Sequence, residues 1–278
     1  MKKISRRSFL AAAGLSVAAL ALTACGGSAS SVASSVASSA SSAAASTSAA
    51  AGELTTVEAG KLTMATNAAF PPYEMTTDAG EFEGIDIETA QAIADKLGLE
   101  LQIDDMDFDA ALLSVQQGKA DIVMAGVTVT DERKAVMDFS DSYATGIQSI
   151  IVPEGSDIAS PDDLAGKKIG TQRGTTGYIY CSDDFGDDAV VAYDNGLTAV
   201  QALNNGQVDA VVIDNAPAKE YVAANPGLVI LDTSYAEEDY AIGMAKGSSL
   251  EAAVNAALEE LKADGTLQAI VDKYITAE

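Results

Sequence analysis

The sequence predicts an α/β fold, with mainly parallel sheets distributed over two similarly built lobes. The chain has 278 residues, more than a usual single domain of about 100 to 150 residues. Short apolar runs of strand length alternate with segments of helical period, which is typical of an α/β architecture. A helix–glycine–x–x–aspartate–strand unit occurs twice, as GKADIVM (118–124) and GQVDAVV (206–212). Chance similarity of two common helix-to-strand turns is the alternative interpretation of this repeat.

The first 25 residues have the pattern of an export signal. A basic start, MKKISRR, precedes an apolar and alanine-rich stretch, FLAAAGLSVAALA (9–21). That stretch is shorter than the roughly 20 apolar residues that a permanent membrane-spanning helix needs. The start also resembles a twin-arginine signal, with the general export route as the alternative.

The signal ends in Leu22-Thr23-Ala24-Cys25, which resembles the lipobox of bacterial lipoproteins. It predicts that Cys25 is acylated and becomes the mature N-terminus, which would anchor the protein on the outer side of the cell membrane. An ordinary secreted protein with a chance cysteine is the alternative. Residues 26–52 contain serine, alanine, glycine, threonine and valine and no charge, so we expect a flexible tether that buries no core.

Composition excludes several kinds of partner. With 16 basic and 41 acidic residues, the chain has a formal net charge of −25, which repels nucleic acids and anionic lipid surfaces. We therefore expect no nucleic-acid partner, membrane contact through the lipid alone, and a monomer. If Cys25 carries lipid, Cys181 is the one cysteine left and cannot form an internal disulfide. The chain has no histidine to act as the base of a cysteine nucleophile, so Cys181 is expected to be a structural thiol.

Eight apolar runs after the tether have the length of strands. We expect strands at KLTMAT (61–66), LELQI (99–103), DIVMAGV (121–127), SIIV (149–152), KKIGT (167–171), AVVAY (189–193), DAVVI (209–213) and AIGMA (241–245).

Three segments between these runs have a helical period. They are DIETAQAIADKLG (86–98), FDAALLSVQQG (108–118) and GLTAVQALNNG (196–206), and each ends at a glycine. In the first, Ile87, Ala90, Ala94 and Leu97 share one face, with Asp86 as the expected N-cap and Gly98 as the C-terminal stop.

Ligands of open α/β sheets bind beyond the carboxyl ends of the strands, and several unusual clusters lie at such positions. After the first strand, Asn67 offers a donor and an acceptor, and Phe70 brings a flat aromatic face to a loop. Phe108 lies at the next strand-to-helix corner. A hydrophobic plug and core packing are the alternative roles of these two aromatic residues.

The most informative cluster follows the predicted strand at 121–127. Gly126 and Thr128 can present hydrogen bonds there, and Arg133 supplies a planar fork that matches a carboxylate. Only two arginines follow the signal, which makes Arg133 at this corner more informative, with a surface salt bridge as the alternative.

Two further corners complete the predicted site. Thr175 and Thr176 begin a helix, where free backbone N–H groups suit an anion. Asp214 ends a strand, where its carboxylate suits an ammonium group. Plain helix capping is the alternative in both places. Together, these five places describe a receptor for a zwitterion with a side chain.

Four segments resemble the polar amino-acid family of solute-binding proteins of ABC importers. They are GIDIETAQAIADKLG (84–98), MDFDAALLSVQQGKADIVMAGVTVTDERKAVMDFSDSY (106–143), GTQRGTTG (170–177) and GQVDAVVIDNAP (206–217). The resemblance implies the two-lobed periplasmic-binding-protein-like fold of type II, in which two crossing segments join the lobes and the first lobe is discontinuous. We expect lobe 1 at 53–146 plus 241–278 and lobe 2 at 147–240. The resemblance further implies lobe closure on the ligand and delivery to an ABC permease.

The resemblance also implies roles for individual residues. The α-carboxylate of an amino acid would be bound by Arg133, Thr128 and the Thr176 backbone, with Thr175 beside it. The α-ammonium would be bound by Asp214 and the Gly126 main chain. Phe70 and Phe108 would enclose the aliphatic part of the ligand, while Asn67 and Gln172 would face the tip of its side chain.

The expected ligand follows from Asn67. The glutamine-binding and the lysine/arginine/ornithine-binding members of the family carry an aspartate at that position, and a neutral amide removes the electrostatic preference for a cation. A neutral polar amino acid such as glutamine or cystine is therefore expected, and the acidic Glu74 nearby leaves a cation site as the alternative.

We expect a binding protein with no catalytic residue, no metal and no cofactor. The first alternative is an enzyme on the same fold, such as a dehydratase, for which Glu74 is the nearest candidate acid. The second is a lipoprotein that docks on a membrane receptor as a sensor.

Overall fold

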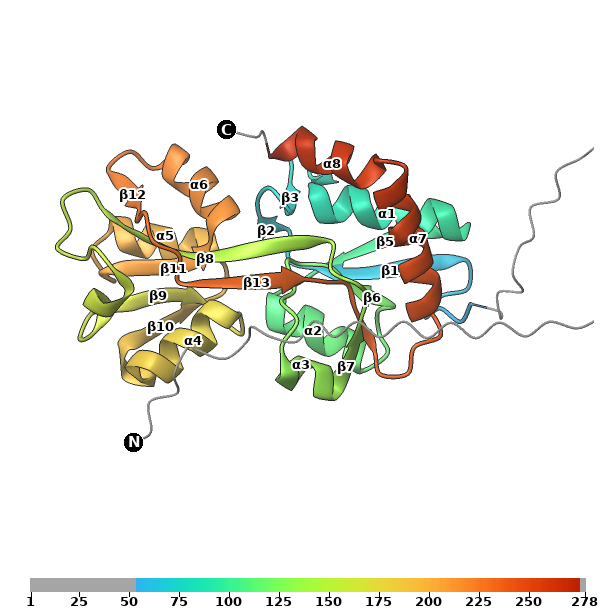
Figure 1. The fold of residues 1–278 in the computed structure, drawn as a ribbon, viewed down its shortest axis with the longest axis horizontal. Coiled ribbons are helices and arrows are strands. Elements are labelled where there is room, and N and C mark those ends of the chain that lie inside the picture. Colours follow the sequence, from blue (N-terminus) through green and yellow to red (C-terminus); the bar gives the residue numbers. More distant parts are fainter. Residues whose placement is uncertain (1–53, 276–278) are drawn as a thin grey trace, which may run out of the picture. The chain divides into compact units, whose positions relative to one another are not determined.

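The computed structural model of the protein describes residues 54–275. In this range, the chain forms two lobes, each built around a β-sheet with helices on its faces (Figure 1). No helix of the described range has the length and apolar character needed to cross a membrane. The predicted signal at 1–25 and tether at 26–52 lie outside the described residues.

The first lobe is built on a five-stranded sheet. In order across the sheet, its strands are β5 (Glu100–Asp105), β1 (Lys61–Thr66), β6 (Ile122–Val123), β14 (Gly243–Ala245) and β7 (Met137–Phe139). β1 pairs in parallel with β5 and β6, whereas β14 runs antiparallel to both of its neighbours. Because β14 comes from the C-terminal part of the chain, this lobe is assembled from two separate stretches of sequence.

Five helices cover this sheet. They are α1 (Ile85–Leu97), α2 (Phe108–Gln116), α3 (Asp131–Val136), α7 (Glu251–Ala263) and α8 (Thr266–Tyr274). α1, α7 and α8 pack against one another over one face, and α2 packs on the other. β1 alternates between the two cores: Leu62 and Met64 join the cluster under α1, and Ala65 joins the cluster under α2. Residues 62–66 of β1 are all buried, as is typical of a strand that is covered on both faces.

The second lobe is built on a six-stranded sheet. Its main path is β10 (Val190–Tyr193), β9 (Ile169–Gln172), β11 (Ala210–Asp214), β8 (Ala144–Pro153) and β12 (Leu228–Ile230), and β13 (Ala236–Tyr240) pairs with β8. The first three strands are parallel, and β8 runs antiparallel to its three partners. Both sheets are therefore mixed, whereas the sequence predicted mainly parallel sheets. The difference arises at the crossings: β8 is a crossing strand, β14 follows the crossing strand β13, and both run antiparallel to their neighbours.

Three α-helices and two short 3-10 helices accompany this sheet. They are α4 (Thr176–Phe185), α5 (Gly196–Asn204), α6 (Asn215–Ala224), η1 (Pro161–Leu164) and η2 (Asp187–Ala189). Cys181 of α4 is fully buried in the core beside Ile150 and Ala210. Burial raises the pKa of the Cys181 thiol to about 12, which suits a structural thiol and not a nucleophile.

The repeated sequence unit folds the same way in both lobes. Each unit ends its helix with a glycine at φ 67°. The Asp121 carboxylate then accepts the N–H of Thr63 in the neighbouring strand at 2.8 Å, and the Asp209 carboxylate accepts the N–H of Lys168, just before the neighbouring strand, at 2.7 Å. The aspartate thus fastens the new strand to the start of its parallel neighbour. The repeat is a structural one, as the sequence predicts.

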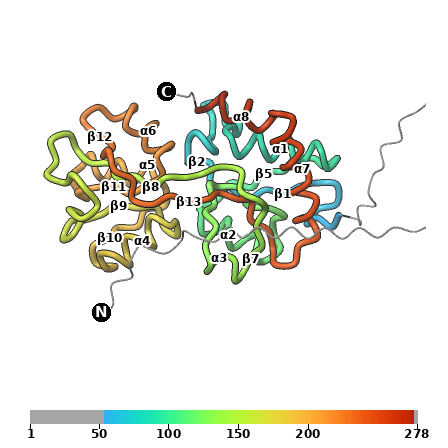
Figure 2. The backbone as a smooth tube through the Cα atoms, viewed as in Figure 1, coloured from blue at the N-terminus to red at the C-terminus, as the bar shows by residue number. Residues whose placement is uncertain are grey.

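The two lobes are joined by the antiparallel pair β8 and β13. Their register runs from Tyr240 opposite Ala144 to Ala236 opposite Gln148, and the two strands lie side by side between the lobes (Figure 2). The family resemblance implies crossings near 144–149 and 239–244. β8 includes the first of these ranges, and β13 overlaps the second at residues 239 and 240. The exact lobe boundaries at 146/147 and 240/241 stay a prediction.

Two local expectations were wrong. The strand expected at 121–127 is reduced to β6, because the chain turns away at Gly126, which has φ 55°. Asp86 does not cap α1, because Gly84 holds the N-cap position, where a Cβ would lie 2.2 Å from the Tyr73 carbonyl oxygen. Asp86 instead lies in the first turn and is fully buried.

A small antiparallel sheet follows β1. It consists of β2 (Ala69–Phe70), β3 (Glu74–Thr76) and β4 (Phe82–Glu83). Phe70 pairs with Glu74 across the first two strands. This sheet places both side chains at the side of the first lobe that meets the second.

Candidate functional site

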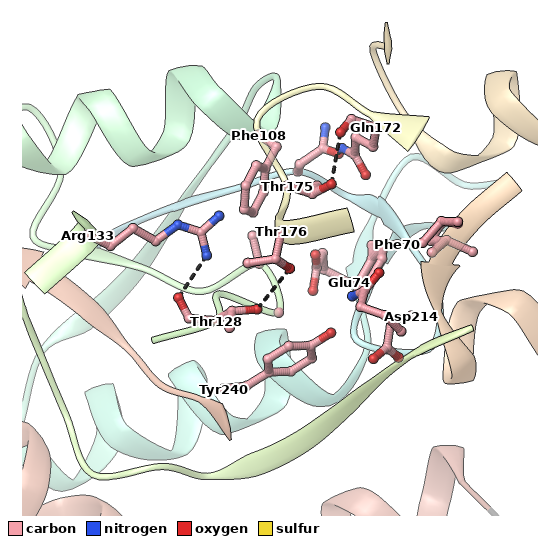
Figure 3. A pocket seen from close by; sticks show the side chains of 16 residues that line it. Phe70, Glu74, Phe108, Thr128, Arg133, Gln172, Thr175, Thr176, Asp214 and Tyr240 are labelled. Atoms are coloured by element: carbon pink, nitrogen blue, oxygen red, sulfur yellow. Dashed lines mark hydrogen bonds between the residues drawn. The ribbon is translucent and has the colours of Figure 1, made fainter. Parts of the chain in front are cut away.

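One pocket is lined by residues of both lobes and of the crossing strands (Figure 3). Every ligand-binding residue predicted from the sequence lines it: Asn67, Phe70, Phe108, Gly126, Thr128, Arg133, Gln172, Thr175, Thr176 and Asp214. The structure thus brings all five predicted places together. That each of these residues contacts a ligand stays a prediction.

Arg133 reaches the pocket from α3. Thr130 caps this helix by accepting the Arg133 backbone N–H at 3.2 Å. The guanidinium is buried and donates to the carbonyl oxygens of Thr128 at 2.7 Å and Gly174 at 3.2 Å. Its carbon lies 5.4 Å from the centre of the Phe108 ring. No acidic side chain of residues 54–275 forms an ion pair with it, so a buried cation is left to be matched by an anion.

The start of α4 faces the same end of the pocket from the second lobe. The Thr175 hydroxyl caps the helix by accepting the Tyr178 N–H at 3.3 Å, as the capping alternative predicted. Thr176 is the first helical residue, and its hydroxyl oxygen lies 3.5 Å from that of Thr128 in the first lobe. The first N–H groups of a helix lack partners within the helix and favour an anion.

Gly126 can be nothing but a glycine in this arrangement. A Cβ at this position would lie 2.9 Å from the Phe70 ring and 3.2 Å from the Tyr240 ring. The Gly126 N–H donates to the buried Asp86 carboxylate at 3.0 Å, and the same carboxylate accepts the Tyr143 hydroxyl at 2.8 Å. Asp86 therefore holds the pocket backbone in place from behind.

Asp214 supplies the acidic end of the pocket. One carboxylate oxygen accepts the Ala216 N–H at 3.0 Å, which caps α6, and the other accepts the Ile147 N–H of β8 at 2.8 Å. Burial raises the pKa of Asp214 to about 6, although hydrogen bonds from Ala216, Tyr240 and Ile147 favour the charged form. Asp214 thus caps a helix and lines the pocket with the same side chain.

Asn67 and Gln172 meet across the lobes. The Gln172 Nε2 donates to the Asn67 Oδ1 at 2.9 Å, while the Asn67 Nδ2 donates to the Met106 carbonyl oxygen at 2.9 Å. Both residues are buried and neutral. This end of the pocket therefore presents amides.

Further hydrogen bonds connect the lobes beside the pocket. The Tyr221 hydroxyl of α6 donates to the Ala69 carbonyl oxygen of β2 at 2.7 Å. Glu238 of β13 accepts the Thr128 hydroxyl at 3.1 Å and the Gln148 Nε2 at 3.0 Å. The structure therefore shows the lobes in contact around the pocket.

Five lining residues were missed by the sequence reasoning: Ala125, Gln148, Val212, Ile213 and Tyr240. Glu74, which the sequence offered as an acid near the site, lines the pocket as well. Gln148 and Tyr240 come from the crossing strands, whose side chains reach the pocket through the strand register.

Comparisons with known proteins bear on this architecture. The sequence profile of the bacterial extracellular solute-binding proteins, family 3, matches residues 62–277. A probable histidine-binding protein of Neisseria gonorrhoeae is 33% identical over 275 residues, which cover 96% of this chain and 95% of the relative. The L-cystine-binding protein of Escherichia coli strain K12 is 33% identical over 226 residues, with coverages of 80% and 85%.

Solved structures of similar proteins are binding proteins as well. An ancestral arginine-binding protein, solved with bound arginine and with bound glutamine, is 43% identical to this chain. The TM-scores are 0.74 for the arginine complex and 0.75 for the glutamine complex. The match covers 78% of this chain and 98% or 99% of the solved chains.

Fold and pocket together define a two-lobed binding protein with the type II periplasmic-binding-protein fold. The chain belongs to the bacterial extracellular solute-binding proteins of family 3. The predicted fold class and the predicted family are thereby confirmed.

Proposed function

We propose that the protein captures a free amino acid outside the cytoplasm and delivers it to the permease of an ABC importer. The observation that carries this proposal is the placement of Arg133 and Asp214. They are buried, oppositely charged and supplied by different lobes, and they line one pocket. A free amino acid offers a carboxylate to the first and an ammonium group to the second.

The remaining lining residues support the same orientation. Thr128 and the start of α4 lie with Arg133 at the carboxylate end. Phe70 and Phe108 offer apolar surface to the ligand side chain, and Asn67 and Gln172 offer amides to its tip. This favours a neutral polar side chain, such as that of glutamine or cystine, and assigns the protein to binding and not to catalysis.

We further propose that the protein is an extracytoplasmic monomer held to the membrane by lipid on Cys25. The lipobox pattern at 22–25 supports the anchor.

Titration calorimetry of Arg133→Ala with L-glutamine, L-cystine and L-arginine tests the clamp. Loss of one partner of a buried charged pair costs about 2 to 5 kcal/mol, so we expect the affinity for the wild-type ligands to fall at least about 30-fold. Arg173→Ala is the matched control, because Arg173 is the other described arginine and is exposed, 3.9 Å from Asp194. Unchanged affinity in Arg133→Ala, with a native circular dichroism spectrum, would remove the clamp from the site.

A further inference from the structure

Glu238 is a buried acidic side chain of the crossing strand β13. It is 6% exposed, although it does not line the pocket. Alternate residues of a strand point to the same face, so Glu238 lies on the same face of β13 as Tyr240, which does line the pocket. The acid is therefore directed toward the pocket and lies directly behind its lining.

Two donors hold the Glu238 carboxylate. The Thr128 hydroxyl of the first lobe donates to Oε2 at 3.1 Å, and the Gln148 Nε2 of β8 donates to the same oxygen at 3.0 Å. A hydroxyl has a single hydrogen to donate. Because Thr128 gives this hydrogen to Glu238, its hydroxyl presents acceptor lone pairs, and not a donor, to the pocket that it lines.

The charge of Glu238 acts on Arg133 without a contact. Burial lowers the pKa of Arg133, and the charge of Glu238 opposes this shift more than that of any other described residue. None of the ion pairs within residues 54–275 joins the two side chains. The guanidinium donates instead to the carbonyl oxygens of Thr128 and Gly174. Glu238 therefore stabilises the buried cation through space.

Two further groups show how far this charge reaches. Burial raises the pKa of Tyr180 on α4 to about 12, and the charge of Glu238 adds to that rise. Burial also raises the pKa of Asp214 at the acidic end of the pocket, and the charge of Glu238 adds to that rise as well. A ligand in this pocket therefore lies within the electric field of Glu238.

A ligand carboxylate beside Arg133 experiences this field with the opposite sign. Like charges in a buried site disfavour each other, so Glu238 repels the group that Arg133 attracts. Glu238 also keeps the hydrogen of Thr128, which lies with Arg133 at one end of the pocket (Figure 3). It thus opposes the carboxylate both by its charge and by the hydrogen bond that it withholds.

We propose that Glu238 limits the affinity of the protein for its amino acid. The role rests on the proposed function and extends it to a residue that does not touch the ligand. Before a ligand binds, Glu238 stabilises the charge of Arg133, and after binding it opposes the ligand carboxylate. Glu238 is in this sense a positioning residue, which acts through Thr128 and Arg133 and eases the release of the amino acid.

Glu238→Gln tests this role, because it removes the charge and keeps the length of the side chain and an oxygen that can accept the Thr128 hydroxyl. Titration calorimetry of the full chain with the standard L-amino acids and L-cystine measures the effect. We expect every probe that binds the wild type to bind this variant about 3- to 10-fold more tightly. A residue that only supports the fold would not give this result, because its loss weakens binding or leaves it unchanged.

Two variants serve as controls. Glu237→Gln removes the same charge from the exposed, opposite face of β13, so its affinity should stay within about twofold of the wild type. Glu238→Asp keeps the buried charge and should likewise tighten binding by less than about twofold. An equal gain of affinity in Glu237→Gln would assign the effect to the net charge of the protein and overturn the role of Glu238.

Glu238→Met is a second neutral variant, for use if Glu238→Gln does not fold. It should also tighten binding, because the Thr128 hydroxyl is then free to donate to the ligand carboxylate. Unchanged or weaker binding in the folded neutral variant overturns the role, and so does the failure of both neutral variants to fold, which would make Glu238 a structural residue. These outcomes leave the proposed function intact, whereas a wild-type protein that binds none of the probes overturns both proposals.

Discussion

Single residues in this pocket combine a structural role with the binding role that we propose. Asp214 caps α6, accepts the N–H of a crossing strand and lines the pocket, where the proposed function gives it the ligand ammonium group. Asp86 holds the backbone of Gly126 and the hydroxyl of Tyr143. Because each carboxylate has fixed donors, its position is set before any ligand arrives, which reduces the ordering cost of binding.

The proposed role of Asp214 predicts that binding depends on pH. The pKa of Asp214 is about 6. The side chain is therefore negatively charged above pH 6 and loses this charge by protonation as the pH falls through that value. We expect the affinity for L-glutamine to be about tenfold lower at pH 5 than at pH 7, measured by calorimetry at both pH values.

Asp214→Asn is the control for this titration. It should bind weakly at both pH values, with a pH ratio close to one. A tenfold pH effect that persists in Asp214→Asn would assign the titration to another group, for which Asp86, with a pKa raised by burial to about 6, is the candidate.

At the level of elements, α6 and β2 connect the lobes through the Tyr221–Ala69 hydrogen bond. A buried hydrogen bond contributes about 0.5 to 1.5 kcal/mol, and a ligand that binds between closed lobes loses affinity when the closed population falls. We expect Tyr221→Phe to weaken amino-acid binding by roughly 2- to 10-fold in calorimetry, with a small change in the melting temperature.

Tyr235→Phe is the matched comparison. The Tyr235 hydroxyl donates to Asp184 at 2.7 Å within the second lobe, so this variant should lower the melting temperature and leave the affinity unchanged. Equal effects of both variants on affinity would mean that the Tyr221 hydrogen bond does not act through the lobes.

The elements also show what could be predicted from the sequence. β1 was found from its run of apolar residues, and the helix–glycine–aspartate units were found because their helical patterns end at a glycine. β2 and β4 have two residues each, too few for any periodicity, and they form because neighbouring strands lie beside them. Asp86 was misplaced because only the close approach of Gly84 to Tyr73 shows where α1 begins.

More of the site than of the small sheet could be predicted from the sequence. Its residues lie at strand ends, where the sequence order itself brings them to one edge of a sheet. Tyr240 and Gln148 escaped detection because their place depends on the register of β8 with β13, which is set by tertiary pairing and not by a local motif.

At the level of the whole molecule, the proposed lipid anchor would have to overcome the charge of the protein. A net charge of −25 repels an anionic membrane surface. We expect Cys25→Ser to move the protein from the membrane fraction to the soluble fraction and to abolish incorporation of labelled fatty acid, without a change in amino-acid affinity.

Cys181→Ser is the control for the anchor. Cys181 is buried in the second lobe, so this variant should stay with the membrane and keep its label. Membrane retention of Cys25→Ser would show that another part of the chain makes the attachment.

The place of β14 sets an order for folding during synthesis. Among residues 54–275, every strand of the second sheet lies within 144–240, whereas β7 of the first sheet pairs with β14 alone. As the chain grows from its N-terminus, the later lobe has all of its strands before the earlier lobe receives its last one. A nascent chain that stops short of residue 243 therefore leaves β7, in the lobe that is synthesised first, without its partner strand β14.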